Sequence, residues 1–138
     1  FLTMQMNLEC DYAIRIVDVI ANANTRIDAK TISERSCVSL RFSLKILHKL
    51  VTNGIVVSFM GTNGGYELAK SPSDISLYDI VCIIDGEYHF NRCIDDNYIC
   101  SRHGKDKQCQ FHNIYCQITN YTVEKLKSYT FDMFLDTK

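Results

Sequence analysis

The sequence of 138 residues contains no apolar run that approaches the roughly 18 residues needed to span a bilayer. Its N-terminus also lacks the basic, then apolar, then small-residue order of a secretory signal. Its single proline is Pro72, and no repeat, low-complexity tract or proline-rich linker divides the chain. These absences predict a cytoplasmic protein that folds as one domain and makes no membrane contact.

Motifs of common enzyme classes are missing as well. The sequence has no C-x-x-C pair, no glycine-rich nucleotide-binding loop and no ordered set of serine, histidine and aspartate. The net charge of only −1 argues against a polyanion-binding surface over the whole molecule. We therefore expect neither an enzyme nor a small-molecule substrate. A small iron–sulfur redox protein remains an alternative of another class, and only the cysteines support it.

Cysteine, in contrast, is abundant. There are seven cysteines and no export signal, which together point to a reducing compartment and to thiol or metal chemistry. The odd number fits poorly with a closed set of disulfides. A chain of this length, 46% hydrophobic, can bury a core without covalent crosslinks.

Three helices are expected in the first part of the chain. An apolar repeat of helical period covers 7–21, and Asp28 stands at the N-cap position of a short helix over 29–35. After a tight turn at 36–38, a third helix is expected over 39–52. Two helices joined by so short a turn predict a helix-turn-helix.

The third helix lies in a basic segment. Residues 26–49 carry a net charge of +4, whereas 71–138 carry −3. At about 100° per residue, the helix is predicted to turn a leucine-rich side inward and a polar stripe outward. The predicted inward side consists of Leu40, Leu44, Leu47, Leu50 and Val51. The predicted polar stripe consists of Arg41, Lys45, His48 and Lys49. Charge alone favours a DNA-contacting face no more than an ordinary solvated one.

A β-hairpin is expected directly after this helix. Residues 55–60 are β-branched and aromatic, the turn at 61–65 is rich in glycine, and a second strand follows at 66–69. A basic helix followed at once by a glycine-tipped hairpin is the order of a winged helix. The predicted fold is therefore mainly α with a small β-hairpin wing.

The remainder of the chain divides into three parts. Ser76 and Asp79 have the spacing of a capping box and start a fourth helix that ends at Gly86. Residues 87–111 show no period and contain three cysteines. A helical period returns from about 112 and predicts a long C-terminal helix.

Four motifs in this order resemble the Rrf2 family of bacterial winged-helix regulators, which includes the IscR and NsrR types of iron–sulfur regulator. They are Asp11-Tyr12-Ala13-Ile14-Arg15, Leu47-x-x-Leu50-x-x-x-Gly54-Ile55-Val56-x-Ser58, Gly61-x-x-Gly64-Gly65-Tyr66-x-Leu68-Ala69 and Ile75-Ser76-Leu77-x-Asp79-Ile80-Val81. The resemblance implies a homodimer that binds double-stranded operator DNA. It implies a winged helix-turn-helix region over 4–86, a cluster-binding loop over 87–111 and a dimerisation helix over 112–135, all within one structural domain.

Family members that hold an iron–sulfur cluster carry three cysteines in the loop before the C-terminal helix. Cys93, Cys100 and Cys109 occupy that loop here, with gaps slightly wider than the commoner family pattern. Thiolate is the soft ligand that iron in a sulfide cluster prefers. The resemblance thus implies a [2Fe–2S] or [4Fe–4S] cofactor, and a redox-switched disulfide among the same thiols is the alternative.

The fourth ligand is open between two residues. Asp11 stands where some members place a carboxylate ligand, which the partner subunit can supply, and His112 matches the histidine ligand of others. Cys116, one helical turn later, is the less favoured candidate. Cys10, Cys37 and Cys82 are expected to be small buried hydrophobic residues rather than ligands.

The DNA-binding residues are expected on the third helix and at the wing. The predicted set is Ser39, Arg41, Lys45, His48, Lys49, Asn63 and Gly64. Many relatives have an arginine before the first wing glycine, where this chain has Met60, so the wing is expected to contribute little to sequence readout. The sequence as a whole predicts a regulator, in the form of a repressor, that senses redox state, nitric oxide or iron supply through its cluster. A cluster-free regulator, switched by cysteine oxidation or by a partner protein, is the alternative.

Overall fold

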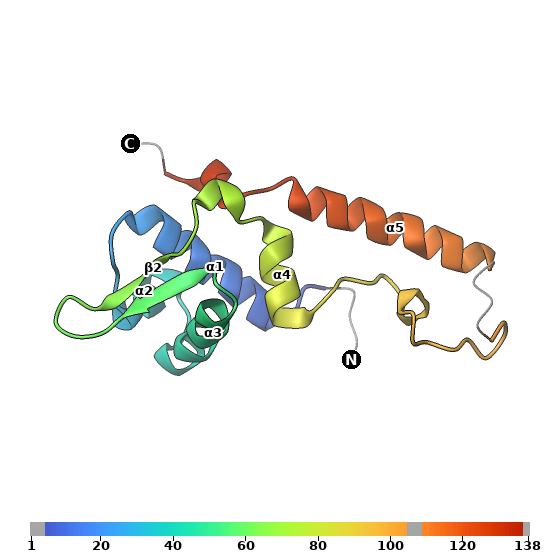
Figure 1. The fold of residues 1–138 in the computed structure, drawn as a ribbon, viewed down its shortest axis with the longest axis horizontal. Helices are drawn as coiled ribbons and strands as arrows, with labels where there is room; N and C mark the ends of the chain where they lie inside the picture. The colour runs from blue at the N-terminus through green and yellow to red at the C-terminus, as the bar shows by residue number, and fades with distance from the viewer. Residues whose placement is uncertain (1–4, 105–108, 137–138) are drawn as a thin grey trace.

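The computed structural model describes residues 5–104 and 109–136, and its elements follow the expected order (Figure 1). The helices are α1 (Leu8–Ala23), α2 (Ala29–Ser36), α3 (Leu40–Thr52), α4 (Leu77–Asp85) and α5 (Gln110–Lys127). The two strands are β1 (Val56–Phe59) and β2 (Gly65–Leu68). Short 3-10 helices cover Pro72–Asp74, Arg92–Ile94 and Phe131–Phe134. The mainly helical fold with one hairpin is confirmed.

Side-chain caps fix where the helices begin. The Asp28 carboxylate accepts the Thr31 N–H at 2.7 Å, which holds the pKa of that carboxyl below its usual value. Ser39 caps α3 in the same way. Ser76 and Asp79 form the predicted capping box at the start of α4, with bonds of 3.1 and 2.8 Å. The expected starts of α2, α3 and α4 are therefore confirmed.

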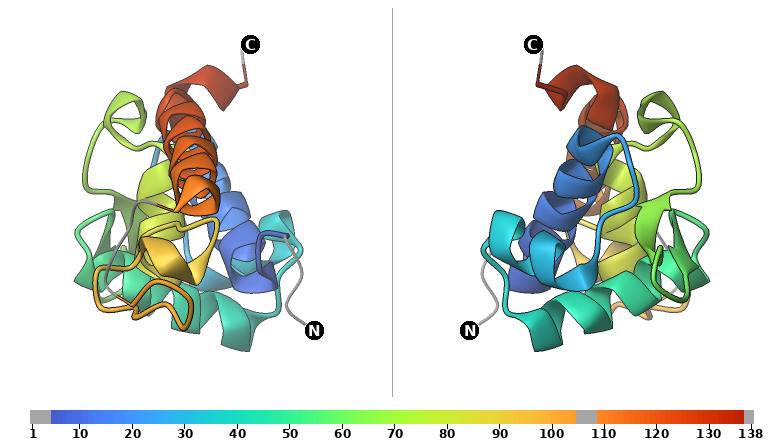
Figure 2. Two further views of the ribbon diagram at one scale, coloured as in Figure 1. Left: turned by 90° about the vertical axis from the view of Figure 1, so that its right-hand side faces the viewer. Right: turned by 90° about the vertical axis from the view of Figure 1, so that its left-hand side faces the viewer.

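The hydrophobic core surrounds α1, which packs against α2, α3, α4 and β2. The apolar face expected for α1 is buried from Ala13 onward, with Ala13, Ile16 and Val17 fully inaccessible, whereas Leu8 at its start is 60% exposed. The other fully inaccessible apolar side chains of this core are Ile32, Ile46, Leu47, Leu50, Ile75 and Ile80. This core fixes α3 on one side of the molecule, with α5 on the opposite side (Figures 1 and 2).

The inward face of α3 differs from the prediction at its N-terminal end. Leu47 and Leu50 are buried, but Leu40 and Leu44 are 45% and 44% exposed. The small Ser43 and the β-branched Ile46 take the inner positions instead. The expectation that Leu40 and Leu44 pack inward is therefore wrong, because the core meets the neighbouring side of the helix.

The hairpin is antiparallel, with Val56 opposite Leu68 and Phe59 opposite Gly65. Ile27 and Tyr66 exchange two backbone hydrogen bonds, of 3.0 and 2.9 Å, so the hairpin is fastened to the segment before α2. A side chain on Gly65 would come within 2.8 Å of the Ile27 carbonyl oxygen, and its φ of 142° also favours glycine. Glycine is needed here for this close backbone approach.

The C-terminal helix is shorter than predicted. The sequence predicts helix to about residue 135, whereas α5 ends at Lys127 and the chain then turns back onto the body. A bridge between Ser76 and Thr130 holds this return, and Phe131 is 1% exposed in the core. Burial of that aromatic ring explains why helix does not continue. In the described ranges, none of the helices is long and apolar enough to cross a membrane.

Candidate functional site

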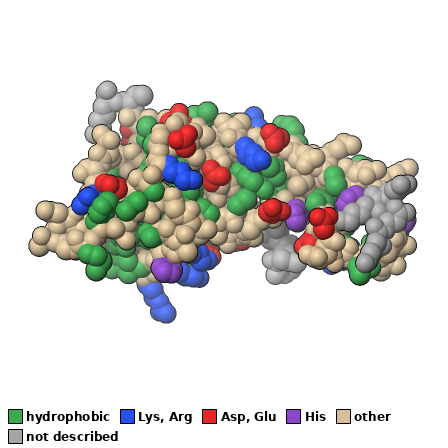
Figure 3. All heavy atoms as spheres, viewed as in Figure 1, with side chains coloured by type: hydrophobic (Ala, Val, Ile, Leu, Met, Phe, Trp, Pro, Cys, Tyr) green, Lys and Arg blue, Asp and Glu red, His purple; other side chains and the backbone are tan. Residues whose placement is uncertain are grey.

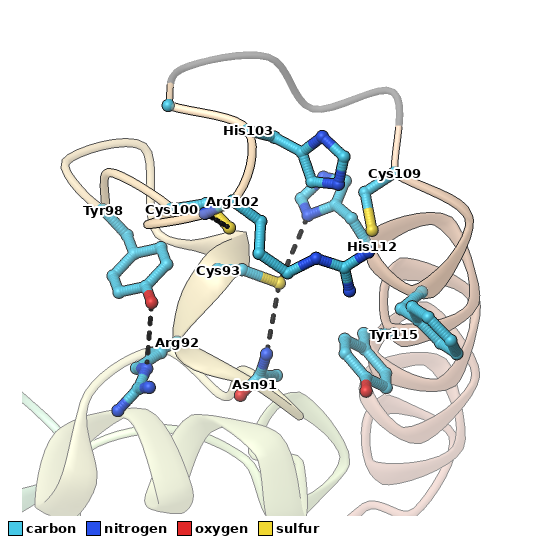
Figure 4. A pocket seen from close by; sticks show the side chains of 12 residues that line it. Asn91, Arg92, Cys93, Tyr98, Cys100, Arg102, His103, Cys109, His112 and Tyr115 are labelled. Atoms are coloured by element: carbon cyan, nitrogen blue, oxygen red, sulfur yellow. Dashed lines mark hydrogen bonds between the residues drawn. The ribbon is translucent and has the colours of Figure 1, made fainter.

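A cavity of about 200 Å³ lies between the segment after α4 and the first turns of α5 (Figure 4). Its lining includes all three cysteines predicted as cluster ligands. The lining residues are Asn91, Arg92, Cys93, Tyr98, Cys100, Arg102, His103, Gly104, Cys109, Phe111, His112 and Tyr115. The fold thus brings together residues that the sequence spaces widely apart.

Each thiol comes from a different local structure. Cys93 lies in the 3-10 helix Arg92–Ile94, where the Asn91 side-chain amide donates to its sulfur at 3.3 Å. Cys100 begins a tight turn that is closed by two backbone hydrogen bonds with Gly104. Cys109 is the N-cap residue of α5. The cavity is therefore built by a short helix, a turn and a helix start.

His112 lies between Cys93 of the cavity and a further thiol, Cys116 of α5. Its Nδ1 lies 3.3 Å from Cys93 Sγ, and its Nε2 lies 3.4 Å from Cys116 Sγ. A neutral imidazole donates through one nitrogen and accepts through the other, so His112 can serve both contacts at once. The histidine lies on the cavity side of α5 (Figure 4), and Cys116 follows one turn later along that helix.

The turn that follows Cys100 favours the negatively charged form of its sulfur. Backbone N–H groups of Arg102 and His103 lower the pKa of the Cys100 thiol below its usual value, with the Arg102 N–H at 3.4 Å from the sulfur. Arg92 also lines the cavity. Thiolate is the form of cysteine that binds metal, so this environment suits ligand chemistry.

The donor set fits an iron–sulfur group better than a single ion. Thiolates are the soft ligands that such a group takes, and an imidazole can replace a thiolate in some clusters. The cavity is many times larger than the roughly 10–15 Å³ that one water molecule requires. Among residues 5–104 and 109–136, no three Cys, His, Asp or Glu side chains are close enough to hold one metal ion. The cavity thus offers thiol and imidazole donors and the room for a group larger than one ion.

The two favoured candidates for the fourth ligand lie in different places. His112 lines the cavity, whereas Asp11 lies on α1 and pairs with Arg15 at 2.8 Å on the surface. Within one chain Asp11 is not among the lining residues, so a partner subunit would have to supply it. Ligation by His112, by Asp11 or by Cys116 therefore stays a prediction.

The other cysteines are only partly as expected. Cys10 is fully buried, and burial, reinforced by Asp85, raises the pKa of its thiol to about 12. Cys82 is half-buried. Cys37 is exposed, so the expectation of a buried residue is wrong there. The cause is its left-handed backbone, with φ 57°, which ends α2 on the surface.

The DNA-contacting side chains predicted on α3 form one exposed surface. Arg41 and His48 are exposed, and the Lys45 side chain is 59% exposed. Figure 3 shows basic side chains and a histidine gathered at the lower edge of the molecule, where α3 lies in Figure 1. Ser39 is exposed as well, but its hydroxyl accepts the Phe42 N–H at 3.3 Å.

Two contacts beside this surface were not anticipated from the sequence. Glu9 of α1 accepts a 2.7 Å hydrogen bond from Lys49 and lies 3.9 Å from the Lys45 ammonium. At the wing, Arg26 stacks over Phe59 and donates to the Asn63 carbonyl oxygen at 3.3 Å. Arg26 belongs to the basic segment 26–49, so its place near the DNA-contacting surface was partly indicated by the sequence. Nothing in the sequence indicated that Glu9 contacts α3.

The wing itself projects from the body beside α2 and α3 (Figure 1). Asn63 is exposed at its tip, and Gly64 is half-buried in the turn. Met60 is 94% exposed and carries no charge. The tip can therefore reach a DNA backbone mainly through its main chain and Asn63.

Comparisons with known proteins agree with this architecture. Residues 6–137 match the Rrf2 family, which is described as an iron-dependent transcriptional regulator. A protein of Aquifex aeolicus named as an HTH-type transcriptional regulator is 28% identical over 127 residues, which cover 91% of this chain and 82% of that protein. The HTH-type transcriptional regulator IscR of Klebsiella pneumoniae is 32% identical over 92 residues, which cover 65% of this chain and 56% of that protein.

Two solved structures share the fold at low sequence identity. IscR of T. potens has a TM-score of 0.73 at 21% identity and covers 94% of this chain and 84% of its own. CymR, the global cysteine regulator of B. subtilis, has a TM-score of 0.78 at 19% identity and covers 97% of this chain and 100% of its own. The family match extends over nearly the entire chain, from α1 to the return after α5. The chain therefore belongs to the Rrf2 family of DNA-binding transcriptional regulators and is not an enzyme.

Proposed function

We propose that this protein is a homodimeric repressor whose operator binding depends on an iron–sulfur cluster held by Cys93, Cys100 and Cys109. The observation that carries the proposal is the convergence of these three thiols, with His112, on one cavity. A bound cluster supplies a centre that reacts to redox state, nitric oxide or iron supply. We assign the fourth ligand to His112, with Asp11 of a partner subunit as the alternative.

The segment that leads into the cavity is joined to α5 by partly buried contacts. The Phe90 N–H donates to the Thr119 hydroxyl of α5 at 3.0 Å, and Thr119 is 6% exposed. The Phe90 and Tyr115 rings pack at 5.5 Å. Since α5 packs on α4, which packs on α1 and α3, a shift of the cysteine loop alters the support of the DNA-binding helices.

The homodimer is supported by a second apolar face on α5. The first face packs on the body through residues such as Tyr115 and Thr119. The second is exposed and consists of Phe111, Ile114, Ile118 and Tyr121, which are 55%, 48%, 36% and 73% exposed. A contiguous apolar stripe on an exposed helix indicates a protein interface. A second copy of α5 would cover it in an isologous dimer.

The DNA-binding surface of the proposed repressor is α3 together with the wing. Arg41, Lys45 and His48 offer donors on one side of α3, which matches the phosphates and base edges of a major groove. Asn63 and Gly64 at the wing tip would contact the DNA backbone. The other two predicted contacts already have partners within the chain. Ser39 caps α3, and its hydroxyl could contact DNA while it keeps that bond, whereas Lys49 would have to exchange Glu9 for a phosphate.

The test is anaerobic reconstitution of the full chain with iron and sulfide. We expect brown protein with broad sulfide-to-iron absorption, which Ala at Cys93, Cys100 or Cys109 abolishes. Cys37→Ala is the matched control, because Cys37 is exposed and outside the cavity lining. Operator affinity should differ between cluster-loaded and cluster-free protein. Colourless protein without iron or sulfide after reconstitution would refute the proposal.

A cluster-free thiol switch is the second candidate, and the contacts of His112 favour it. An imidazole beside Cys93 and Cys116 can take up a thiol proton and so generate the reactive thiolate. Hydrogen peroxide would then accept two electrons and two protons from two cavity thiols, forming one disulfide and two waters. This candidate predicts operator binding that changes with peroxide in iron-free protein and is restored by dithiothreitol.

A further inference from the structure

Two leucine side chains on α3 face solvent instead of the core. Leu40 and Leu44 are 45% and 44% exposed although they begin the most strongly amphipathic helix of the fold. They are four residues apart, so they adjoin each other on successive turns. Exposed leucines occur singly on many surfaces, but a pair on this helix needs a physical account.

The position of the pair on the helix excludes a role in the core. At about 100° per residue, the buried side of α3 centres on Ile46 and Leu50, and Leu40 and Leu44 lie at its outer border. Further round the helix, within about 140° of Leu40, come His48, Arg41 and Lys45. The two leucines therefore belong to the same exposed surface as the basic side chains.

We propose that Leu40 and Leu44 are specificity-determining residues that contact thymine C5-methyl groups in the major groove. The inference rests on the proposed role of α3 as the reading helix and adds the bases that it selects. Thymine presents the one methyl group among the major-groove base edges, and apolar side chains recognise it by contact. Recognition helices contact bases through their N-terminal residues, and Leu40 and Leu44 lie in the first two turns of α3.

The charges beside Leu40 and Leu44 favour DNA over a protein as the partner of this apolar pair. Arg41 and Lys45 directly follow the two leucines in the sequence, so cations flank the apolar patch. A polyanion satisfies these cations at the phosphates while its groove presents methyl groups between them. An apolar protein surface would instead remove water from Arg41 and Lys45 without offering them any acceptor.

The experiment removes single methyl groups from the DNA. The preferred site of the full chain is first selected from random duplexes, and each of its thymines is then replaced by deoxyuridine, which lacks only the C5 methyl. Loss of a contacted methyl should weaken wild-type binding about fourfold, which corresponds to one buried methyl group. Each leucine variant should lose this discrimination at the one thymine that its leucine contacts. Leu44→Ala and Leu40→Ala should therefore each bind the thymine and deoxyuridine duplexes equally at that position, because the side chain that senses the methyl group is gone.

Leu8→Ala is the matched control, since Leu8 is an exposed leucine on α1, and it should keep the wild-type discrimination. Unchanged melting temperatures show that the α3 variants remain folded. Wild-type protein that ignores every deoxyuridine, or leucine variants that still discriminate, would overturn the inference. A uniform loss of affinity on site and random duplexes would also overturn it. Because Arg41→Ala and Lys45→Ala test α3 separately, such failures leave the proposed function intact.

Discussion

The Lys49 ammonium donates a 2.7 Å hydrogen bond to the Glu9 carboxylate, which joins the first turn of α1 to the last turns of α3. The Lys45 ammonium lies 3.9 Å from the same oxygen atom. Glu9 is only 20% exposed, so the contact is better shielded than an ordinary surface ion pair. One carboxylate therefore competes with DNA phosphates for two cations of the proposed reading helix.

Glu9→Gln is expected to strengthen binding to random duplex. The neutral amide releases Lys49, which can then contact a phosphate, and the salt slope of binding should rise by about one unit. The measurement is a salt-series titration on operator and random duplex. Glu124→Gln removes the same charge from α5 and should leave the slope unchanged. An unaltered slope in the Glu9 variant would mean that the pair does not restrain α3.

Arg41→Ala and Lys45→Ala test the reading helix itself. Both side chains are exposed, so neither variant should unfold the protein. A side chain that contacts a base edge should cost roughly 1–3 kcal/mol of specific binding and relax the preference at one position. A phosphate contact should instead weaken binding on all sequences and lower the salt slope by about one unit. The site should be near-palindromic, with half-sites about one helical turn apart. If both variants bind with wild-type affinity at every salt concentration, α3 is not the helix that reads the DNA.

His112→Ala is expected to leave a cluster that assembles, decays faster and has a shifted absorption spectrum, because the imidazole already lies in the cysteine cavity. Asp11→Ala should show this behaviour only if a partner subunit supplies the carboxylate. Cys116→Ala, which keeps His112, is the comparison within the same helix. Anaerobic absorbance followed over time distinguishes the three variants. If Cys116→Ala alone has the effect, the assignment to His112 is wrong.

Ile118→Glu tests the second apolar face of α5. Ile118 is 36% exposed in the single chain, so a glutamate there should not unfold it. In a dimer it would bury an unpaired carboxylate, and the dimer dissociation constant should rise roughly tenfold or more. Asn120→Glu places the same charge about 160° round the helix and should have little effect. Sedimentation velocity of the wild type and the two variants measures the dimer dissociation constant. An unchanged constant in Ile118→Glu would place the interface elsewhere.

Thr119→Val removes the hydroxyl that accepts the Phe90 N–H while keeping the shape of the side chain. The unpaired N–H should lower the free energy of unfolding by about 1–3 kcal/mol. Thermal melting measures this loss, and faster hydrogen exchange at the Phe90 amide locates it. Thr119→Ser retains the hydroxyl and should keep that amide protected. Equal protection in the valine variant would show that the bond does not hold the loop to α5.

Short-range features of this protein could be predicted from the sequence. The caps at Asp28 and Ser39 and the box between Ser76 and Asp79 join residues only three positions apart. The glycine-rich turn of the wing and the basic character of α3 are equally local. Such features depend on side-chain chemistry and backbone conformation within one turn, which the order of residues largely determines.

Features that join distant parts of the chain were decided only by packing. Helical periodicity placed Leu40 and Leu44 on the apolar side of α3, but the core contacts a sector centred further round that helix. The helix after the cysteine loop was expected to continue, yet burial of Phe131 against the body turns the chain back. In both cases, whether the apolar side chain is buried depends on the other elements that pack against it. The sequence pattern of a single helix carries no information about those elements.

The same division applies to the candidate site. The resemblance to cluster-binding members of the Rrf2 family nominated Cys93, Cys100, Cys109 and His112, and tertiary structure placed them around one cavity. The contacts of His112 with Cys93 and of Glu9 with Lys49 join residues 19 and 40 positions apart. Distances between such residues depend on how whole helices pack, because the chain between them has many conformations until the core fixes one.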